Sequence, residues 1–411
     1  MGVSSSAAAA AATINGADTA WMLVSTVLVL LMTMPGIMLF YSGMLRTRNT
    51  LSIMAQTIAT IGVVTIVWAA IGYSLAFSSG SELIGGLSKV WAEGLIGGKV
   101  SVHPIAPTIP EAVFFLFQMA FAIITCAIIL GATAERMRIG ATMLFSAFWL
   151  VAVYAPVAHW VWHPEGWLAR LGHMDFAGGT VVHILAGVSG LVAANMAGPR
   201  RGFGKEPMVP HNLSLTVLGA GLLWAGWFGF NAGSAFEASN RAAGALLATQ
   251  VAAGAGALIW AVCEMVRRQQ MSVLGMATGA IAGLIAITPA SGYVGVYGAV
   301  CIGAIAAVAC FVVVSVFKST TRIDDSLDVF ALHGVGGIVG TVLTPMFALR
   351  EVAAVTATVT TNLVGAVAVS AYAVAMTWII MKLVSFIVGI RVTEKEEMVG
   401  LDLAQHGESA A

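Results

Sequence analysis

The chain consists mostly of apolar runs that are each long enough to cross a bilayer. A spanning helix needs about 20 predominantly apolar residues, because the hydrocarbon core is roughly 30 Å thick. Charged residues make up only 9% of the 411 residues, against roughly 25% in an ordinary soluble domain. Backbone groups in lipid must pair within the chain, so such runs predict an all-α polytopic membrane protein. We expect eleven transmembrane helices, at 20–43, 51–77, 111–133, 139–163, 177–198, 213–236, 243–266, 272–291, 293–316, 328–349 and 352–386.

The basic residues predict the orientation. An odd number of spans places the chain ends on opposite sides, and cytoplasmic loops carry the excess of Lys and Arg. With the N-terminus outside, 14 of the 19 basic residues are cytoplasmic and five are not. The cytoplasmic set is Arg46, Arg48, Arg136, Arg138, Arg200, Arg201, Lys205, Arg267, Arg268, Lys318, Arg322, Lys382, Arg391 and Lys395; the outer set is Lys89, Lys99, Arg170, Arg241 and Arg350. The C-terminus is therefore expected in the cytoplasm.

Two segments place a histidine shortly after an aspartate inside an apolar run. In DFAGGTVVHILAG, His183 follows Asp175, and in DVFALHGVGG, His333 follows Asp328. A titratable side chain within a membrane span is costly and suggests function. By helical rise, His183 lies roughly 12 Å and His333 roughly 7.5 Å beyond its aspartate. We expect the imidazoles to meet and share a hydrogen bond; the alternative is two packing histidines, each bonded to a backbone carbonyl. Asp175 is expected first of all as a helix N-cap, with attraction of a cation as a secondary role.

The same two segments indicate a duplication. Five spans separate them, so their helices run in opposite directions, as inverted repeats require, and such repeats place the functional site at their interface. The last span is longer than a bilayer needs and is expected to tilt. The expected organisation is an extracytoplasmic segment 1–19, repeats 20–198 and 213–350 joined by the cytoplasmic loop 199–212, an eleventh helix 351–388 and a cytoplasmic tail 389–411.

Aromatic residues gather at the expected outer ends of three spans. LLWAGWFGFNAGSA brings Trp224, Trp227, Phe228 and Phe230 towards Ser234; FQMAFAIIT places Phe117 and Phe121 four apart on one face; YAPVAHWVWHPEGW carries Trp160 and Trp162. Singly, such residues usually form the interfacial belt. Together, indoles with a hydroxyl and no deep carboxylate suit a small, weakly hydrated cation held by cation–π attraction.

Other chemistry finds little support. His159 and His163 in HWVWH are four residues apart and form a possible metal pair, but no HExxH motif and no acid besides Glu165 completes a site. The four cysteines lie in apolar runs without metal or disulfide spacing. The net charge of zero gives no argument for nucleic acid. We expect no enzyme activity, catalytic residue, metal or other cofactor, and a metal-dependent membrane enzyme is the disfavoured alternative.

Ordered blocks along the chain carry a family resemblance. They are PGIMLFYSGMLRTRN, GYSLAF, FQMAFAIIT, GATAER, DFAGGTVVH, GFGKE with PHNL, WFGFNAGSA, TPASGYV, DVFALHGVGGIVG and a tail with GIRV, GLD and HGE. From about Ala20 to Glu408 the chain resembles the ammonium transporters of the Amt/Mep/Rh family. The resemblance implies an ammonium transporter of the bacterial inner (plasma) membrane: a homotrimer with a pore in each subunit of eleven helices, built from two inverted five-helix repeats.

The resemblance also implies roles for single residues. Trp162 and Ser234 match the vestibule positions that hold ammonium. Because both residues are present, the chain resembles the Amt branch of the family rather than the Rhesus branch. Phe121 and Phe230 match the stacked pair that closes the outer mouth, with Phe117 and Trp227 lining the approach. His183 and His333 match the twin histidines of the pore. Asp175 matches a structural and electrostatic acid, and we group Asp328 with it.

The resemblance further implies a partner, a PII-type signalling protein that binds the cytoplasmic face through the tail from Arg391 to Glu408; this tail ends HGESAA, without the tyrosine common in the family. An apolar pore favours neutral ammonia, because burying a bare cation costs roughly tens of kcal/mol. We therefore expect ammonium to be recruited, deprotonated and conducted as ammonia, with the relay of its proton left open. An ammonium sensor with little transport remains the alternative.

Overall fold

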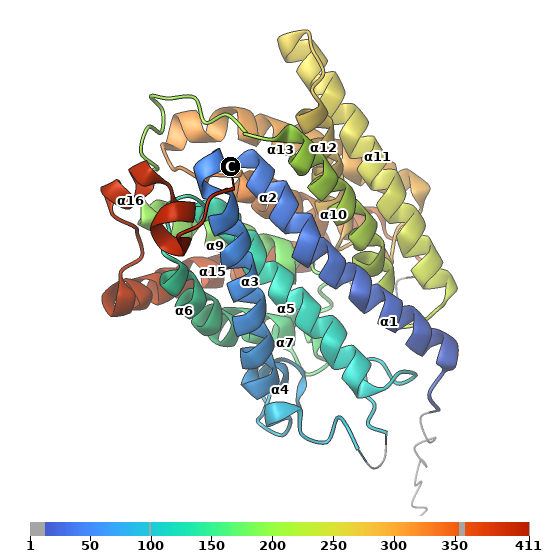
Figure 1. Cartoon of the computed structure of the whole chain (residues 1–411). Helices are drawn as coiled ribbons and strands as arrows, with labels where there is room; N and C mark the ends of the chain where they lie inside the picture. Colours follow the sequence, from blue (N-terminus) through green and yellow to red (C-terminus); the bar gives the residue numbers. More distant parts are fainter. Residues whose placement is uncertain (1–12, 98–99, 353–357, 411) are drawn as a thin grey trace, which may run out of the picture.

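The computed structural model describes residues 13–97, 100–352 and 358–410. Most of the expected N-terminal segment, residues 1–12, therefore lies outside the described part, as do residues 353–357 at the start of the expected last span. The described chain folds into a bundle of long helices (Figure 1). The all-α fold class is confirmed.

Ten helical stretches of the described chain are long and apolar enough to span a membrane, and an eleventh, α12, is shorter. In several of these stretches a π-helical turn joins two α-helices into one continuous span. In chain order the helices are α1 (Gly16–Leu31) with α2 (Met38–Met44), α3 (Thr50–Val67) with α4 (Tyr73–Phe77), α5 (Glu111–Thr133), α6 (Ile139–Trp149) with α7 (Ala155–Trp162) and α8 (Trp167–Leu171), α9 (Leu185–Ala197), α10 (Leu213–Gly233), α11 (Asn240–Arg268), α12 (Val273–Ile287), α13 (Val296–Thr321), α14 (Val335–Phe347), α15 (Val359–Val388) and the tail helix α16 (Glu394–Val399).

Some helices begin or end at other residues than the expected spans, and hydrogen bonds from capping side chains are one reason. The first helix begins at Gly16 rather than residue 20, because the Asn15 side chain accepts hydrogen bonds from the backbone N–H groups of Ala17 (2.8 Å) and Asp18 (3.2 Å). The eighth expected span, 272–291, ends at Ile287 and continues as turns. Side-chain caps of this kind satisfy N–H groups that hydropathy alone does not register.

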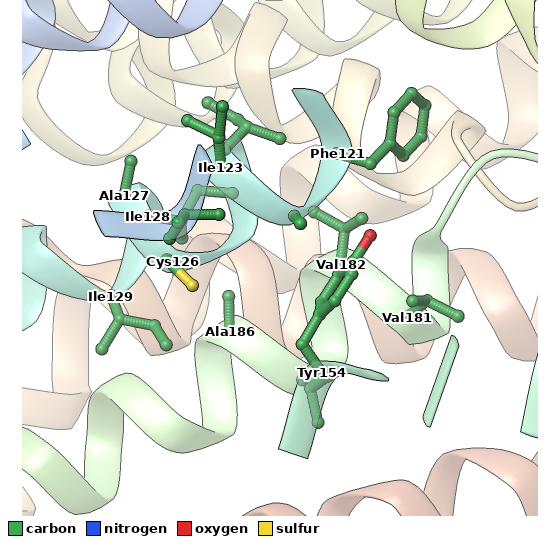
Figure 2. Close-up of a cluster of buried hydrophobic side chains, with 14 of the residues drawn as sticks. Phe121, Ile123, Cys126, Ala127, Ile128, Ile129, Tyr154, Val181, Val182 and Ala186 are labelled. Atoms are coloured by element: carbon green, nitrogen blue, oxygen red, sulfur yellow. The ribbon is translucent and has the colours of Figure 1, made fainter. Parts of the chain in front are cut away.

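Helix α5 occupies the centre of the bundle. Almost all of its residues are buried, and it packs against α1, α3 and α9. Figure 2 shows an apolar contact between two of these helices, where Cys126 and Ile129 of α5 approach Ala186 of α9. Cys126 is a free, buried thiol, in keeping with the expected packing role.

Helix α15 is the long last span. Its 30 residues extend over about 45 Å, well beyond a hydrocarbon core of roughly 30 Å. Figure 1 shows it crossing the bundle obliquely to α3, with α16 and the tail folded back against α3 and α6. The division into inverted repeats at 199–212 stays a prediction, although His183 and His333 occupy equivalent places just before α9 and α14.

Candidate functional site

The two histidines expected to meet do meet. The Nδ1 atoms of His183 and His333 lie 3.1 Å apart, and the ring planes are tilted by 36°. The side chains are buried, with exposed fractions of 1% and 8%. One nitrogen must donate and the other accept, a requirement that two neutral rings in opposite tautomers meet. Both rings keep their Nε2 atoms for other partners, and that of His183 has none among the described residues.

Both histidines lie in π-helical turns, which the sequence analysis did not predict. His183 belongs to the turn η6 (Gly179–Ile184) before α9, and His333 to η7 (Phe330–Gly334) before α14. A π turn inserts one residue into the helix and shifts the side chains that follow, and such turns are frequent at functional sites. Because both histidine segments carry such a turn just before the α-helix that follows, we attribute the direction of the imidazoles to these turns.

Glycines at the contact allow the two histidine segments to lie close together. A Cβ atom at Gly187 would collide with the backbone nitrogen of Gly334, and one at Gly337 would lie 2.9 Å from the Gly179 carbonyl oxygen. Side chains at these positions would therefore force the backbones apart. The glycine-rich runs noted after each histidine allow the approach that brings the imidazoles within hydrogen-bond distance.

The histidines line a narrow apolar cavity of about 20 Å³. A water-sized molecule needs about 10–15 Å³ by the same measure, so the cavity holds a single small molecule. The Trp227 ring stacks on His183 at 5.5 Å between centroids, and Phe230 lies at 6.1 Å. Other walls come from Ile124 and Ile128 of α5. A bare cation finds no solvation here.

Two phenylalanines separate this cavity from a second one. Phe121 and Phe230 stack at 4.0 Å between ring centroids with 13° between their planes, and both are almost fully buried. Phe230 lines the histidine cavity and Phe121 the second cavity, which has a volume of about 60 Å³. We call this second cavity the vestibule; it is lined by Phe77, Ile105, Gln118, Phe121, Trp162, Phe176, Ser234 and Phe236.

Trp162 and Ser234 meet in the vestibule. The Trp162 Nε1–H donates to the Asp175 carbonyl oxygen at 3.0 Å, which fixes the indole, and the ring meets Phe121 edge to face at 5.8 Å. The Ser234 hydroxyl donates to the Phe230 carbonyl oxygen at 2.9 Å. Its proton is therefore committed, and its lone pairs remain free to accept. The vestibule thus offers ring faces and an oxygen acceptor.

Two residues expected on the approach lie elsewhere. Trp227 lines the histidine cavity instead, because it precedes Phe230 by three residues and so lies about 4.5 Å further along α10, on the histidine side. Phe117 packs against Phe121 and Phe236, at centroid distances of 4.8 and 5.8 Å, behind the vestibule wall. Trp160 and Trp224 also lie outside the site: Trp160 packs on Tyr372, and Trp224 donates to Gln250.

Asp175 organises the backbone before η6. Its carboxylate accepts from the N–H groups of Gly178, Gly179, Thr180 and Val181 at 2.6–3.1 Å, the arrangement of an N-terminal cap. Burial raises the pKa of Asp175 to about 6, although the four N–H groups favour the charged form. The carboxylate is therefore committed to the backbone, and only its carbonyl oxygen reaches Trp162.

The corresponding cap before η7 is Asp325 rather than Asp328. Asp325 accepts from the Phe330 N–H at 2.7 Å, whereas Asp328 has a left-handed backbone (φ 57°) and pairs with Lys318 at 3.0 Å. Burial, and then the neighbouring Asp328, raise the pKa of Asp325 to about 6. The sequence RIDDSLDV offers three aspartates, and spacing alone did not identify the capping one.

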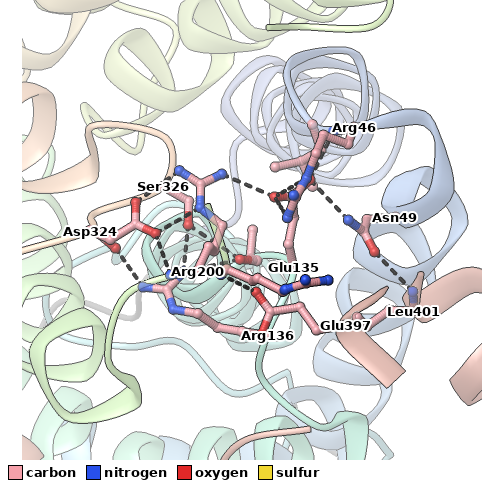
Figure 3. Close-up of polar contacts among 12 residues, drawn as sticks. Arg46, Asn49, Glu135, Arg136, Arg200, Asp324, Ser326, Glu397 and Leu401 are labelled. Atoms are coloured by element: carbon pink, nitrogen blue, oxygen red, sulfur yellow. Dashed lines mark hydrogen bonds and ion pairs between the residues drawn. The ribbon is translucent and has the colours of Figure 1, made fainter. Parts of the chain in front are cut away.

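A buried ionic network that the sequence analysis did not single out ties the C-terminal tail to the bundle (Figure 3). Glu135 pairs with Arg46 at 2.8 Å and Arg200 at 3.1 Å, and Arg200 also pairs with Asp324 at 2.8 Å. Asn49 donates to Glu135 and accepts from the Leu401 N–H. Burial raises the pKa of Glu135, but Arg200 and Arg46 outweigh it and hold the pKa below its ordinary value of 4.5. The signal was present in GATAER, where a Glu-Arg pair follows an apolar run.

In HWVWH, His159 contacts backbone carbonyl groups and the ring of His163. The two ring nitrogens of His159 lie 2.9 and 2.8 Å from the carbonyl oxygens of Ala76 and Ser81, and the ring stacks on His163 at 4.5 Å. Both nitrogens are thus occupied by acceptors. Among the described residues no group of three or more His, Cys, Asp and Glu side chains is arranged to hold a metal ion.

Comparisons with known proteins identify the family of the chain. Residues 20–411 match the Ammonium Transporter Family. The chain is 44% identical over 402 residues to an ammonium transporter of Bacillus subtilis (strain 168), covering 96% of this chain and 98% of that protein. Among solved structures it is similar to Candida albicans Mep2, with TM-score 0.87, 39% identity and coverage of 97% and 91%. It is also similar to a protein described as "Sensor Amt Protein", with TM-score 0.88, 29% identity and coverage of 95% and 98%.

Proposed function

The chain belongs to the ammonium transporter family, and from that premise we propose a route for its substrate: ammonium binds in the vestibule, loses a proton near the phenylalanine pair and passes the histidines as ammonia. The protein is a multi-pass ammonium transporter and not an enzyme. The observation that carries the proposed route is the Nδ1–Nδ1 contact of His183 and His333 inside an apolar cavity of about 20 Å³.

Recruitment of the cation rests on Trp162, Ser234 and Phe121. An ammonium ion is attracted to aromatic faces with about 2 kcal/mol when desolvated, and it donates N–H bonds to oxygen. The free lone pairs of Ser234 and the indole held by the Asp175 carbonyl supply both interactions. The vestibule volume of about 60 Å³ accommodates a cation of this size with water beside it.

Passage as ammonia follows from the walls beyond the phenylalanine pair. The cavity around the histidines is apolar apart from the imidazoles, so a bare cation there would lose its hydration at a cost of roughly tens of kcal/mol. Neutral ammonia donates and accepts hydrogen bonds without that cost. The same imidazole pair, with one donor and one acceptor nitrogen in contact, also supports relay of the released proton.

Assembly and regulation belong to the same proposal. We propose a homotrimer in a plasma membrane (a bacterial inner membrane), with the N-terminus outside and the tail in the cytoplasm. A PII-type signalling protein would bind the cytoplasmic face, supported by the ordered tail from Arg391 to Glu408 along α3 and α6. Pull-down of a PII protein by the full chain, but not by a chain truncated before Arg391, is expected; equal recovery would contradict a role of the tail.

The second candidate is an ammonium sensor with little transport. A protein described as a sensor shares the fold at 29% identity. Uptake of ammonium by vesicles reconstituted with the purified protein separates the two functions. Saturable uptake that potassium does not inhibit supports transport, whereas binding without uptake would support the sensor.

A further inference from the structure

The vestibule contains a side-chain amide whose oxygen has no hydrogen-bond partner among the described residues. Gln118 of α5 is 4% exposed and lines the vestibule together with Trp162 and Ser234. Its Oε1 atom is buried and has no hydrogen-bond partner among the described residues. Buried amides are almost always hydrogen-bonded, because an unmade bond costs free energy. The unpaired oxygen of this buried amide therefore requires an explanation.

The surroundings of Gln118 point to a ligand as the missing partner. Apart from Gln118 and Ser234, the vestibule is lined by aromatic and aliphatic side chains. Gln118 precedes Phe121 by three residues, so both project from the same face of α5 on the vestibule side of the phenylalanine pair. The matched case is Gln56 of α3, which is equally buried but bonds to Ser52, Met137 and Thr142.

We propose that Gln118 is a further ligand of the recruited ammonium ion, accepting one N–H bond through its side-chain carbonyl oxygen. This inference rests on the proposed function of the vestibule. The two ends of an amide exchange places by a half turn about the last side-chain bond, so the oxygen can face the cation. Ser234 provides the second oxygen acceptor, since its own proton is donated to Phe230. The remaining N–H groups face the rings of Trp162 and Phe121.

This arrangement also contributes to selectivity. Ammonium has four N–H groups in fixed tetrahedral directions, which two oxygens and two ring faces can satisfy. Potassium has no N–H groups and requires a surrounding shell of oxygens, such as the carbonyl rings of channel filters. A neutral amide gives one directed acceptor without the charge that would attract any cation. Gln118 therefore favours ammonium over potassium of the same charge.

The test measures concentration-dependent ammonium uptake by reconstituted protein. Gln118→Leu is expected to raise the half-saturating ammonium concentration about tenfold with little change in maximal rate, because a hydrogen bond to a charged group is lost. Gln118→Glu keeps the acceptor oxygens and adds a charge, so it is expected to retain ammonium affinity while potassium becomes an inhibitor. Gln250→Leu, at an amide on α11 that bonds to Trp224 outside the vestibule, is the control and should leave both properties unchanged.

Two outcomes would overturn the inference, and they are distinguishable. If Gln118→Leu leaves half-saturation unchanged while Trp162→Leu raises it, the vestibule recruits ammonium without Gln118. If neither variant changes it, the recruitment site lies elsewhere and the proposed route fails as well. Should Gln118→Leu not assemble, Gln118→Glu decides: absence of potassium inhibition in a variant of normal assembly and uptake overturns the role of Gln118 in selectivity.

Discussion

Trp162 is the residue whose contribution is most easily separated from folding. Its indole forms one vestibule wall, and its orientation is fixed by a single hydrogen bond to the Asp175 carbonyl. Trp160, two residues earlier on α7, packs on Trp167 and Tyr372 and donates to Leu83 instead. Two tryptophans of the same helix end thus face different sides. Their spacing alone did not separate them, whereas the family resemblance assigned the vestibule position to Trp162.

We expect Trp162→Leu to raise the half-saturating ammonium concentration some thirtyfold, because a desolvated cation–π contact contributes about 2 kcal/mol. Exclusion of other cations should weaken as well. Trp160→Leu is the matched control and should leave the half-saturating concentration unchanged. The measurement is uptake by reconstituted protein, with assembly checked for both variants. An unchanged response in Trp162→Leu would move the recruitment site away from this indole.

Helices α9 and α14 bring the histidines together, and part of their geometry was predictable. The aspartate–histidine spacing and the glycine-rich runs correctly predicted two imidazoles sharing a hydrogen bond inside the membrane. The π turns η6 and η7, the capping by Asp325 and the depth of Trp227 were not predictable. These features depend on one-residue shifts in helical register, which an apolar run of uniform hydropathy does not encode.

The contact between these helices predicts the effect of a single methyl group. Gly187→Ala would place a Cβ atom against the Gly334 backbone, which cannot yield, so we expect a marked fall in thermal stability together with loss of transport. Gly62→Ala in α3 is the control: a Cβ there meets nothing within 4 Å. Since alanine is favoured over glycine inside a helix by about 1 kcal/mol, that variant should be as stable as the wild type or more so. A Gly187→Ala protein with unchanged stability and uptake would contradict the close crossing.

Considered as one unit, the molecule has two cavities on either side of the phenylalanine pair and an ionic network beneath its tail. The residues of the proposed route could be named from the sequence, because histidines and aromatic clusters stand out in otherwise aliphatic runs. The network could not be named in this way, because Glu135, Arg200 and Asp324 come from three distant segments and meet only in the fold. The pKa of Asp324 is shifted in the same direction as that of Glu135. Burial raises the pKa of Asp324, but the neighbouring Arg200 outweighs burial and lowers this pKa below its ordinary value of 3.8.

The network predicts how stability depends on pH. Glu135→Gln removes one anion between the buried Arg200 and the partly exposed Arg46, and it should destabilise the protein by about 3–5 kcal/mol. Because the folded pKa of Glu135 is lowered, its contribution is complete above its ordinary pKa of 4.5 and disappears as the pH falls below that value. Thermal unfolding of wild type and variant should therefore differ by a constant amount from pH 8 to about pH 5 and converge as the pH falls further, through the lowered pKa of Glu135.

The control for this measurement is Glu396→Gln. Glu396 has 30% side-chain exposure and lies 3.8 Å from Arg138, so its ion pair should contribute no more than about 1 kcal/mol. Glutamine also preserves the capping box that begins α16. A difference between wild type and Glu135→Gln that grows as the pH falls would contradict the assigned charge of Glu135.

The proposed route depends most on what His183 and His333 do for the proton. The double variant His183→Leu with His333→Leu should fold and assemble, since leucine suits an apolar wall, yet it cannot donate or accept a proton. In vesicles reconstituted with equal amounts of assembled protein, the electrical current evoked by an ammonium pulse is the quantity to measure. Relay through the imidazole pair predicts that the current of the double variant is lost. A full wild-type current would contradict the relay and leave the histidines as pore lining only.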